Sequence, residues 1–230
     1  MHYLFDVDGT LTPSRGKINP AFGDWFLAFA KTHTVSLVSG SDYQKTIDQL
    51  GSEIIEATKF VFSCSGNVVR DCGVIVHEHQ WGIPGDALCY LHNAVYTSQY
   101  TERYGKHFER RTGMINVSVV GRNATGRERT DYYHWDLIHS ERASIARTLN
   151  QRWPELVAVV GGETSIDISR IGSDKSQVLK WIIGDIAFFG DRMDPIGNDY
   201  PLAAAILAEN RGESHTVRCW QNTWRLLESL

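Results

Sequence analysis

The chain has 230 residues, 42% of them hydrophobic, which is enough to bury a sizeable core in one or two domains. Its formal net charge of −4 gives no general attraction to nucleic acid or to a membrane surface, so we expect neither as a partner. The four cysteines lack CxxC spacing, no signal peptide precedes Asp6, and no segment approaches the roughly 20 apolar residues of a membrane span. We therefore expect a cytoplasmic protein with reduced thiols.

The first part of the chain alternates between strands and helices. We expect strands at residues 2–6, 34–38 and 60–62, helices at 20–31 and from Asp42 to Leu50, and a hairpin formed by 68–70 and 74–77. Pro20 favours a helix start, and Asp42 has the position of a helix cap. This alternation is typical of a parallel sheet flanked by helices.

The middle of the chain has a different order of elements. We expect a helix from 84–86 to about Tyr104, a strand at 114–120, a mostly helical segment at 131–152, and a hairpin formed by 156–160 and 165–168. This order interrupts the alternation seen before it. We therefore predict that residues 82–172 form an inserted α+β cap domain.

After Gly172 the earlier pattern returns. We expect a helix capped by Ser173 or Asp174 and running to Ile182, strands at 186–189 and 215–217, and helices at 197–209 and 220–230. Residues 1–81 and 173–230 are therefore predicted to form one α/β core. Its expected architecture is a doubly wound, mostly parallel sheet of the Rossmann type.

Polar residues stand at the expected strand ends of this core. Asp6 and Asp8 follow the first strand, Ser39 the second, and Asp191 a later one, while Lys175 begins a helix. Taken singly, Ser39 is typical of a turn and Lys175 of a helix surface. Because the carboxyl ends of parallel strands lie along one edge of a sheet, we expect these side chains to converge. Carboxylates, a hydroxyl and an ammonium suit Mg²⁺ and a phosphoryl group.

A local excess of positive charge lies in the expected cap. Between Arg103 and Arg129 the basic residues are Arg103, Lys106, Arg110, Arg111, Arg122, Arg127 and Arg129, and the acids are Glu109 and Glu128. The segment suits binding of a phosphate or another anion. A solvated basic surface is the alternative reading.

Four segments in chain order resemble the motifs of haloacid dehalogenase-like phosphotransferases. They are DVDGT (6–10), LVSGS (37–41), DKSQVL (174–179) and FFGDRMDPIGND (188–199). A closer resemblance, to the eukaryotic-type phosphomannomutase family, rests on three segments: DVDGTLTPSR (6–15), RTGMINVSVVGR (111–122) and GGETSID (161–167). The resemblance covers the core and the cap.

The resemblance implies a role for each matching residue. Asp6 would be the nucleophile that becomes an aspartyl phosphate, and Asp8 the general acid/base. Mg²⁺ would be bound by the side chains of Asp6 and Asp191 and by the backbone carbonyl of Asp8. Thr10 and Ser39 would contact phosphoryl oxygens, and Lys175 would balance their charge. The substrate-binding residues would be Arg15, Arg111, Arg122, Arg129, Ser165 and Asp167, with the arginines on the phosphate that is not transferred.

The implied activity is a phosphohexomutase that interconverts mannose 6-phosphate and mannose 1-phosphate, with glucose phosphates as further candidate substrates. A hexose 1,6-bisphosphate would be its activator, and a homodimer through the cap is a further expectation. A Mg²⁺-dependent sugar-phosphate phosphatase with the same aspartyl phosphate is the alternative, and a sugar-phosphate sensor without activity is a third. The sequence departs from the family after Ser118 and after Asp167, which leaves the preferred sugar open.

Overall fold

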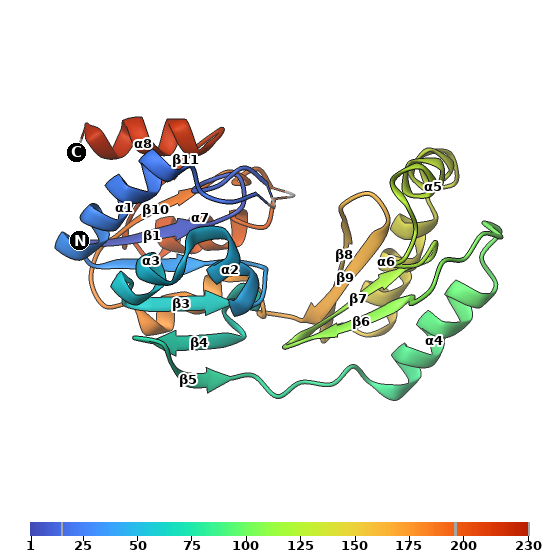
Figure 1. The fold of residues 1–230 in the computed structure, drawn as a ribbon. Coiled ribbons are helices and arrows are strands. Elements are labelled where there is room, and N and C mark those ends of the chain that lie inside the picture. Colours follow the sequence, from blue (N-terminus) through green and yellow to red (C-terminus); the bar gives the residue numbers. More distant parts are fainter. Residues whose placement is uncertain (15, 196, 230) are drawn as a thin grey trace. The chain divides into compact units, whose positions relative to one another are not determined.

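A computed structural model describes residues 1–14, 16–195 and 197–229 (Figure 1). The chain divides into two compact units. Unit 1 comprises Met1–His79 and Gly172–Leu230, and unit 2 comprises Gln80–Ile171. None of the helices in the described residues has the length and apolar character needed to cross a membrane.

Unit 1 is built on a seven-stranded sheet with the order β11-β10-β1-β2-β3-β4-β5. The strands are β1 (His2–Asp6), β2 (Val35–Val38), β3 (Phe60–Ser63), β4 (Val68–Asp71), β5 (Val74–Glu78), β10 (Ile186–Gly190) and β11 (Gly212–Thr216). The five strands from β11 to β3 are parallel, and β4 and β5 add an antiparallel hairpin at one edge. The predicted α/β fold with a mostly parallel sheet is thus confirmed.

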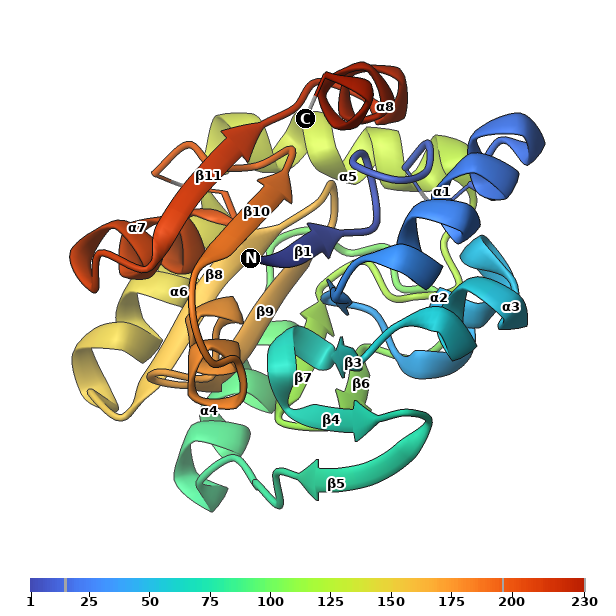
Figure 2. The same ribbon diagram turned by 90° about the vertical axis from the view of Figure 1, so that its left-hand side faces the viewer.

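Helices cover both faces of this sheet (Figures 1 and 2). They are α1 (Pro20–Thr32), α2 (Tyr43–Leu50), α3 (Ser52–Ala57), α7 (Tyr200–Ala208), α8 (Trp220–Glu228) and the short 3₁₀ helices η1 (Cys64–Gly66) and η2 (Lys175–Trp181). Phe5 of β1 packs with α1, α3 and α8, whereas its neighbour Leu4 packs with η2 and α7. Successive residues of a strand point to opposite faces, so apolar residues are needed on both.

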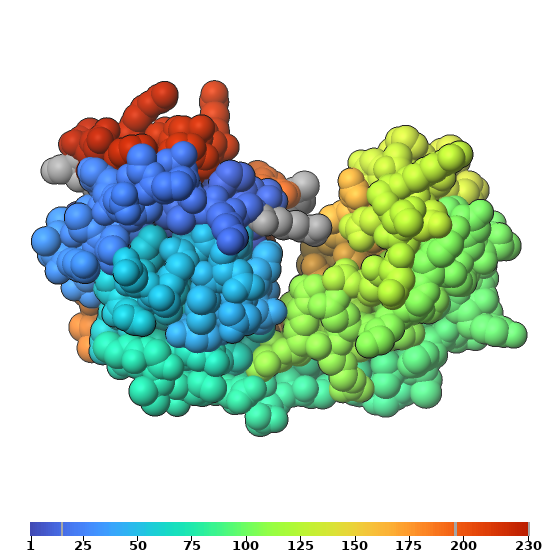
Figure 3. Space-filling view, viewed as in Figure 1, coloured from blue at the N-terminus to red at the C-terminus, as the bar shows by residue number. Residues whose placement is uncertain are grey.

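Local signals explain where the first helices begin. Asn19 caps α1 by accepting a hydrogen bond from the Phe22 amide at 3.2 Å, and Pro20 occupies the first turn. Asp42 caps α2 in the same way, with the Lys45 amide as donor at 2.8 Å. The side chains of α1, α2 and α3 (blue to cyan) form much of the surface of unit 1 on one side (Figure 3). Both helix starts agree with the sequence-based expectation.

Unit 2 is a four-stranded antiparallel sheet with helices packed on one face. Its elements are α4 (Gly85–Tyr96), β6 (Phe108–Arg111), β7 (Met114–Ser118), α5 (Gly126–His139), α6 (Glu141–Arg152), β8 (Leu156–Gly161) and β9 (Ser165–Arg170), with the strand order β6-β7-β9-β8. Ile115 and Ile166 face a core that contains Leu91, Tyr132 and Leu149 of the helices. On β7 and β9 the alternate positions include the polar residues Asn116 and Asp167, whose side chains point away from that core.

The helix after residue 84 is shorter than expected. It ends at Tyr96 rather than near Tyr104. The side chain of Arg103, from the segment that follows, donates hydrogen bonds to the carbonyls of Val95 and Ser98 at 3.0 and 3.5 Å. The bond to Val95 satisfies a carbonyl group that the end of a helix leaves without a partner inside the helix.

The segment expected to be mostly helical over 131–152 is two helices. They meet at Ser140, whose φ of 54° lies in the left-handed region. The buried side chains of Asp136 and Arg142 form an ion pair at 2.8 Å across this corner. Arg142 also donates a hydrogen bond to the Gly162 carbonyl at 3.0 Å, and this bond joins the corner between the two helices to the β8–β9 turn.

Three elements near the C-terminus differ from their expected form. The helix after Asp174 is a 3₁₀ helix, and α7 begins at Tyr200 rather than at residue 197. Strand β11 begins at Gly212, three residues earlier than expected. A Cβ at Gly212 would lie 2.1 Å from the Ile186 carbonyl oxygen, so the close pairing of β11 with β10 requires a glycine there.

Candidate active site

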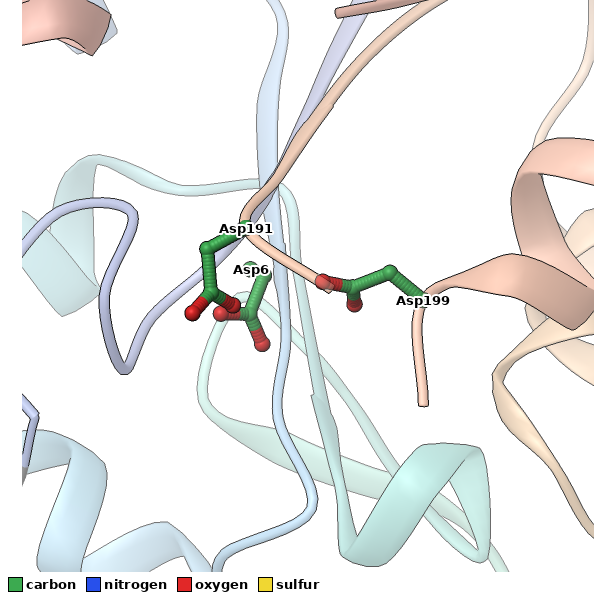
Figure 4. A group of neighbouring side chains, drawn as sticks. All are labelled: Asp6, Asp191 and Asp199. Carbon is green, nitrogen blue, oxygen red and sulfur yellow. The ribbon is translucent and has the colours of Figure 1, made fainter. Parts of the chain in front are cut away.

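Three carboxylates meet at the carboxyl ends of β1 and β10. Asp6 is the last residue of β1, Asp191 follows the last residue of β10, and Asp199 directly precedes α7. Each contributes an oxygen, and these oxygens lie within 4.8 Å of one another (Figure 4). Oxygen ligands at such spacing are what Mg²⁺ binds in proteins.

A buried lysine joins two of these acids. Lys175 is 1% exposed, and its Nζ donates hydrogen bonds to Asp6 and, at 2.6 Å, to Asp199. Burial alone would lower the pKa of Lys175, but the two adjacent carboxylates outweigh it and raise that pKa above its ordinary value. Asp199 also accepts a hydrogen bond from the Arg192 amide at 3.0 Å.

The cluster carries more negative than positive charge. Burial raises the pKa of Asp6 to about 7, although the ammonium of Lys175 acts in the opposite direction. Burial, with Asp199 nearby, also raises the pKa of Asp191. One ammonium cannot balance three carboxylates, so a divalent cation would compensate the remaining charge. The residues present therefore fit the expected Mg²⁺.

The loop after β1 folds back over Asp6. The amides of Thr10, Leu11 and Thr12 all donate to the Val7 carbonyl, at 3.3, 3.0 and 3.1 Å. This turn brings the Thr10 hydroxyl within 3.3 Å of the Asp6 carboxylate, to which it donates.

Gly9 makes the turn possible. Its φ is +84°, and a Cβ at this position would lie 2.4 Å from the Asp191 carboxylate. Gly9 thus permits both the left-handed backbone and the close approach of Asp191.

Two residues of α2 hold Asp8. Lys45 Nζ lies 3.1 Å from one carboxylate oxygen of Asp8, and Gln49 Nε2 lies 2.9 Å from the other. Lys45 also donates to the Ser41 hydroxyl at 2.9 Å. The structure thus places Asp8, in the loop that follows Asp6, beside α2.

Ser39 lies at the same edge of the sheet. It follows Val38, which is paired with Asp6 in the β1–β2 register. Its side chain is buried, and its Oγ accepts a hydrogen bond from the Ser41 amide at 3.0 Å. The predicted residues Asp6, Asp8, Thr10, Ser39, Lys175 and Asp191 are thus all at the carboxyl ends of the parallel strands.

Unit 2 carries a separate network of charged side chains on its polar sheet face. Arg111 and Arg122 both form ion pairs with Glu109, the first at 2.8 Å, and they hold the pKa of Glu109 below its usual range. Arg122 also donates to Asn116 at 2.9 Å, and Asn116 donates to Asp167 at 2.5 Å. The predicted binding residues are thus linked through Glu109 and Asn116, which the sequence did not single out for binding.

The other predicted residues of the cap have different partners. Arg129 pairs with Glu163 at 3.5 Å, on the turn between β8 and β9. The Ser165 hydroxyl donates to the Gly161 carbonyl at 2.9 Å across the same turn. Arg15, also predicted to bind substrate, lies outside the described residues.

Comparison with known proteins places this site in a family. Residues 23–230 match the sequence model of the family described as eukaryotic phosphomannomutase. The phosphomannomutase of Triticum aestivum is 32% identical over 239 residues, covering 99% of this chain and 94% of that protein. The Saccharomyces cerevisiae phosphomannomutase is 31% identical, with 99% and 92% covered.

The chain belongs to the eukaryotic phosphomannomutase family. The family resemblance predicted from the sequence motifs is therefore confirmed.

Solved structures show the wider fold of this phosphomannomutase family member. A haloacid dehalogenase-like hydrolase from Bacteroides thetaiotaomicron superposes with a TM-score of 0.61 at 12% identity, covering 87% of this chain and 84% of that one. The Plasmodium falciparum IMP-nucleotidase gives a TM-score of 0.62 at 14% identity, with 99% and 67% covered. At these identities the likeness concerns the fold alone, and it confirms the haloacid dehalogenase-like fold.

Sequence reasoning assigned no role to Asp199, although the haloacid dehalogenase-like motif FFGDRMDPIGND ends on it. Its 0% exposure and its contact with Lys175 mark it as part of the acidic cluster. A signal that could have predicted this role is the position of Asp199, which ends a recognised motif and directly precedes an apolar helix. Lys45 and Gln49 were also missed, and their i, i+4 spacing on one helix is the signal that could have found them.

Proposed function

We propose that this protein is a phosphohexomutase that interconverts mannose 6-phosphate and mannose 1-phosphate through a phospho-Asp6 intermediate. The observation that carries the proposal is the group formed by Asp6, Lys175, Asp191 and Asp199 at one buried point of a phosphomannomutase family member. This group offers a nucleophile, a charge-balancing ammonium and metal ligands together.

Mg²⁺ would be held by the side chains of Asp6 and Asp191 and by the backbone carbonyl of Asp8, with Asp199 adjacent. When bound, it neutralises charge on the phosphoryl group. Lys175 supplies a second positive charge beside Asp6. Thr10 and Ser39 contact phosphoryl oxygens through their hydroxyl groups.

In the proposed reaction, a hydroxyl oxygen of the sugar phosphate attacks the phosphorus of phospho-Asp6, the bond between phosphorus and the Asp6 oxygen breaks, and Asp8 takes the proton of that hydroxyl. The resulting sugar bisphosphate turns around within the site. In the return step the free Asp6 carboxylate attacks the phosphorus at the other end of the sugar, the bond between that phosphorus and its sugar oxygen breaks, and Asp8 gives the proton to the leaving oxygen. The contacts with Lys45 and Gln49 fix the position of the Asp8 carboxylate.

A mutase has to bind a sugar that carries phosphate at either end, and so needs a second anion site. We propose that unit 2 is the substrate-binding cap and that Arg111 and Arg122 bind the phosphate that is not transferred. Arginine binds phosphate with two hydrogen bonds in a fixed geometry. Arg15 and Arg129 would complete this site, and Ser165 and Asp167 would contact the sugar.

The activator of such a mutase is a hexose 1,6-bisphosphate, which supplies the first phosphoryl group to Asp6. Glucose phosphates are further candidate substrates, because nothing in the charge arrangement distinguishes the two sugars.

We also propose a homodimer formed through unit 2, where a groove between α4 and β6 is lined by His92, Tyr96 and Phe108. Tyr96 is 87% exposed there. Light scattering tests the dimer, and a monomeric mass at micromolar concentration would contradict it.

The decisive test of the function is an incubation with mannose 1-phosphate, Mg²⁺ and a catalytic amount of a hexose bisphosphate. We expect mannose 6-phosphate to form faster than free phosphate. Free phosphate without any mannose 6-phosphate would mean that water accepts the phosphoryl group, and the protein would then be a sugar-phosphate phosphatase.

A further inference from the structure

The C-terminal helix contacts the loop that follows Asp6 (residues 7–12, here called the catalytic loop) through a buried hydrogen bond. Thr223 of α8 is 0% exposed, and its Oγ1 donates to the backbone carbonyl of Thr10 at 2.7 Å across 213 residues of sequence. The hydroxyl of the same Thr10 donates to the Asp6 carboxylate. A chain of two hydrogen bonds therefore runs from α8 to Asp6.

Aromatic packing fixes α8 in its place. Trp220 and Trp224 stack on Phe22 of α1, with ring centroids 5.8 and 5.3 Å apart, and Leu227 is buried beside them. The two helices lie side by side (Figures 1 and 2). Residues Val7 and Leu11 of the catalytic loop belong to the same apolar core. These contacts hold α8, and with it Thr223, against the catalytic loop.

The bond made by Thr223 differs from that of other helical threonines in this chain. Thr32 and Thr130 donate to carbonyls four residues earlier in their own helices, which is the common local pattern. Thr223 instead donates to a different element. Because the Thr223 side chain is fully buried, its hydroxyl is held toward the Thr10 carbonyl.

We propose that Thr223 is a positioning residue for phosphoryl transfer at Asp6. It holds the backbone at Thr10, so that the Thr10 hydroxyl stays aimed at the Asp6 carboxylate. The C-terminal helix is then part of the catalytic apparatus, although it supplies no group that touches substrate. The inference rests on the proposed function, in which Asp6 is the nucleophile.

The test compares Thr223→Val, which keeps the shape and loses the hydroxyl, with Thr223→Ser, which keeps the hydroxyl. Thr58→Val is the matched control, because Thr58 is also buried and donates to a carbonyl, that of Ile55, at 2.7 Å. Thr58 precedes β3, so it lies at the end of the sheet opposite the candidate site.

At a temperature where circular dichroism shows all proteins folded, Thr223→Val should lower kcat about tenfold, because small misplacements of reacting groups have large effects on rate. Its KM should change much less. Thr223→Ser should retain kcat within about twofold, since the anchoring hydrogen bond remains. Thr58→Val should leave kcat unchanged. Equal kcat values for Thr223→Val and Thr58→Val would overturn the inference.

A second measurement does not depend on the sugar substrate. Beryllofluoride with Mg²⁺ mimics a phosphoryl group on a carboxylate, and calorimetry reports its binding. We expect Thr223→Val to bind it about tenfold more weakly than Thr58→Val, for the same positional reason. If the wild type lacks mutase activity but this difference holds, only the proposed sugar reaction fails. Equal binding by both variants overturns the role of Thr223, and so does a wild type that binds no beryllofluoride.

Discussion

Replacing Lys175 by methionine tests how the buried cluster is held together. The side chain of Lys175 is fully buried and forms ion pairs with Asp6 and Asp199. Methionine has a similar length and keeps the packing, but it leaves two buried carboxylates without their cation. Breaking a buried ion pair in this way destabilises a protein by about 3–5 kcal/mol. That is a large part of the roughly 5–15 kcal/mol that stabilises a typical domain.

The chain offers a matched control in Lys59, whose Nζ lies 2.6 Å from Asp71. The distance equals that between Lys175 and Asp199, also 2.6 Å, but the Lys59 side chain is 45% exposed. Exposed ion pairs contribute little because water and salt screen them. We therefore expect Lys59→Met to unfold at nearly the wild-type urea concentration and Lys175→Met at a much lower one.

The assay is urea unfolding followed by hydrogen exchange at β1 and β10, so that the signal comes from unit 1. Without the ammonium, the pKa of Asp6 in the folded state rises further above its unfolded value. The folded state then binds more protons, so the deficit of Lys175→Met should shrink as the pH falls from about 7 to about 5. Mg²⁺ should restore part of the lost stability. Equal stability of the two lysine variants would refute the reasoning.

Three further predictions concern single side chains. Asp199→Asn should weaken Mg²⁺ binding measured by calorimetry by about tenfold, because one carboxylate of the cluster loses its charge; unchanged affinity would place the ion elsewhere. Arg122→Ala should raise the KM for mannose 1-phosphate roughly 30-fold, which corresponds to the loss of about 2 kcal/mol of binding free energy from a charge-assisted hydrogen bond. Arg127, whose side chain is 92% exposed, is the control, and equal KM values for the two alanine variants would count against the anion site. Burial lowers the pKa of the His2 imidazole in the folded state to about 4, whereas its unfolded value is about 6.5. As the pH falls below about 6.5, the unfolded chain therefore binds a proton that the folded chain does not, and the free energy of unfolding decreases. Between about pH 7 and about pH 5 the wild type should lose about 2 kcal/mol more than His2→Asn, and parallel curves would contradict this.

The sequence predicted the core of unit 1 well because its signals are local. Pro20 and Asp42 start helices at positions that short motifs define. Asp6, Asp8, Ser39 and Asp191 stand at strand ends, and the rule that such ends share one edge of a parallel sheet was enough to bring them together.

Of the parts that were missed, some depend on pairings that only the fold creates, and one has a weak local pattern. Asp199 acquires its place from Lys175, 24 residues earlier, and no local pattern announces the pair. Glu109 counted only as an acid in a basic segment until the structure placed it between Arg111 and Arg122. Strand β6 was not predicted because its residues, Phe108–Arg111, are mostly charged and give no apolar run.

The central claim is that the phosphoryl group passes through Asp6. It is tested most directly by quenching the enzyme in acid after incubation with a hexose 1,6-bisphosphate and Mg²⁺, followed by mass spectrometry of its peptides. We predict that one phosphoryl group is found on the peptide that contains Asp6, and that it is absent from the Asp6→Asn variant. A phosphoryl group on another peptide, or turnover by Asp6→Asn, would contradict the mechanism.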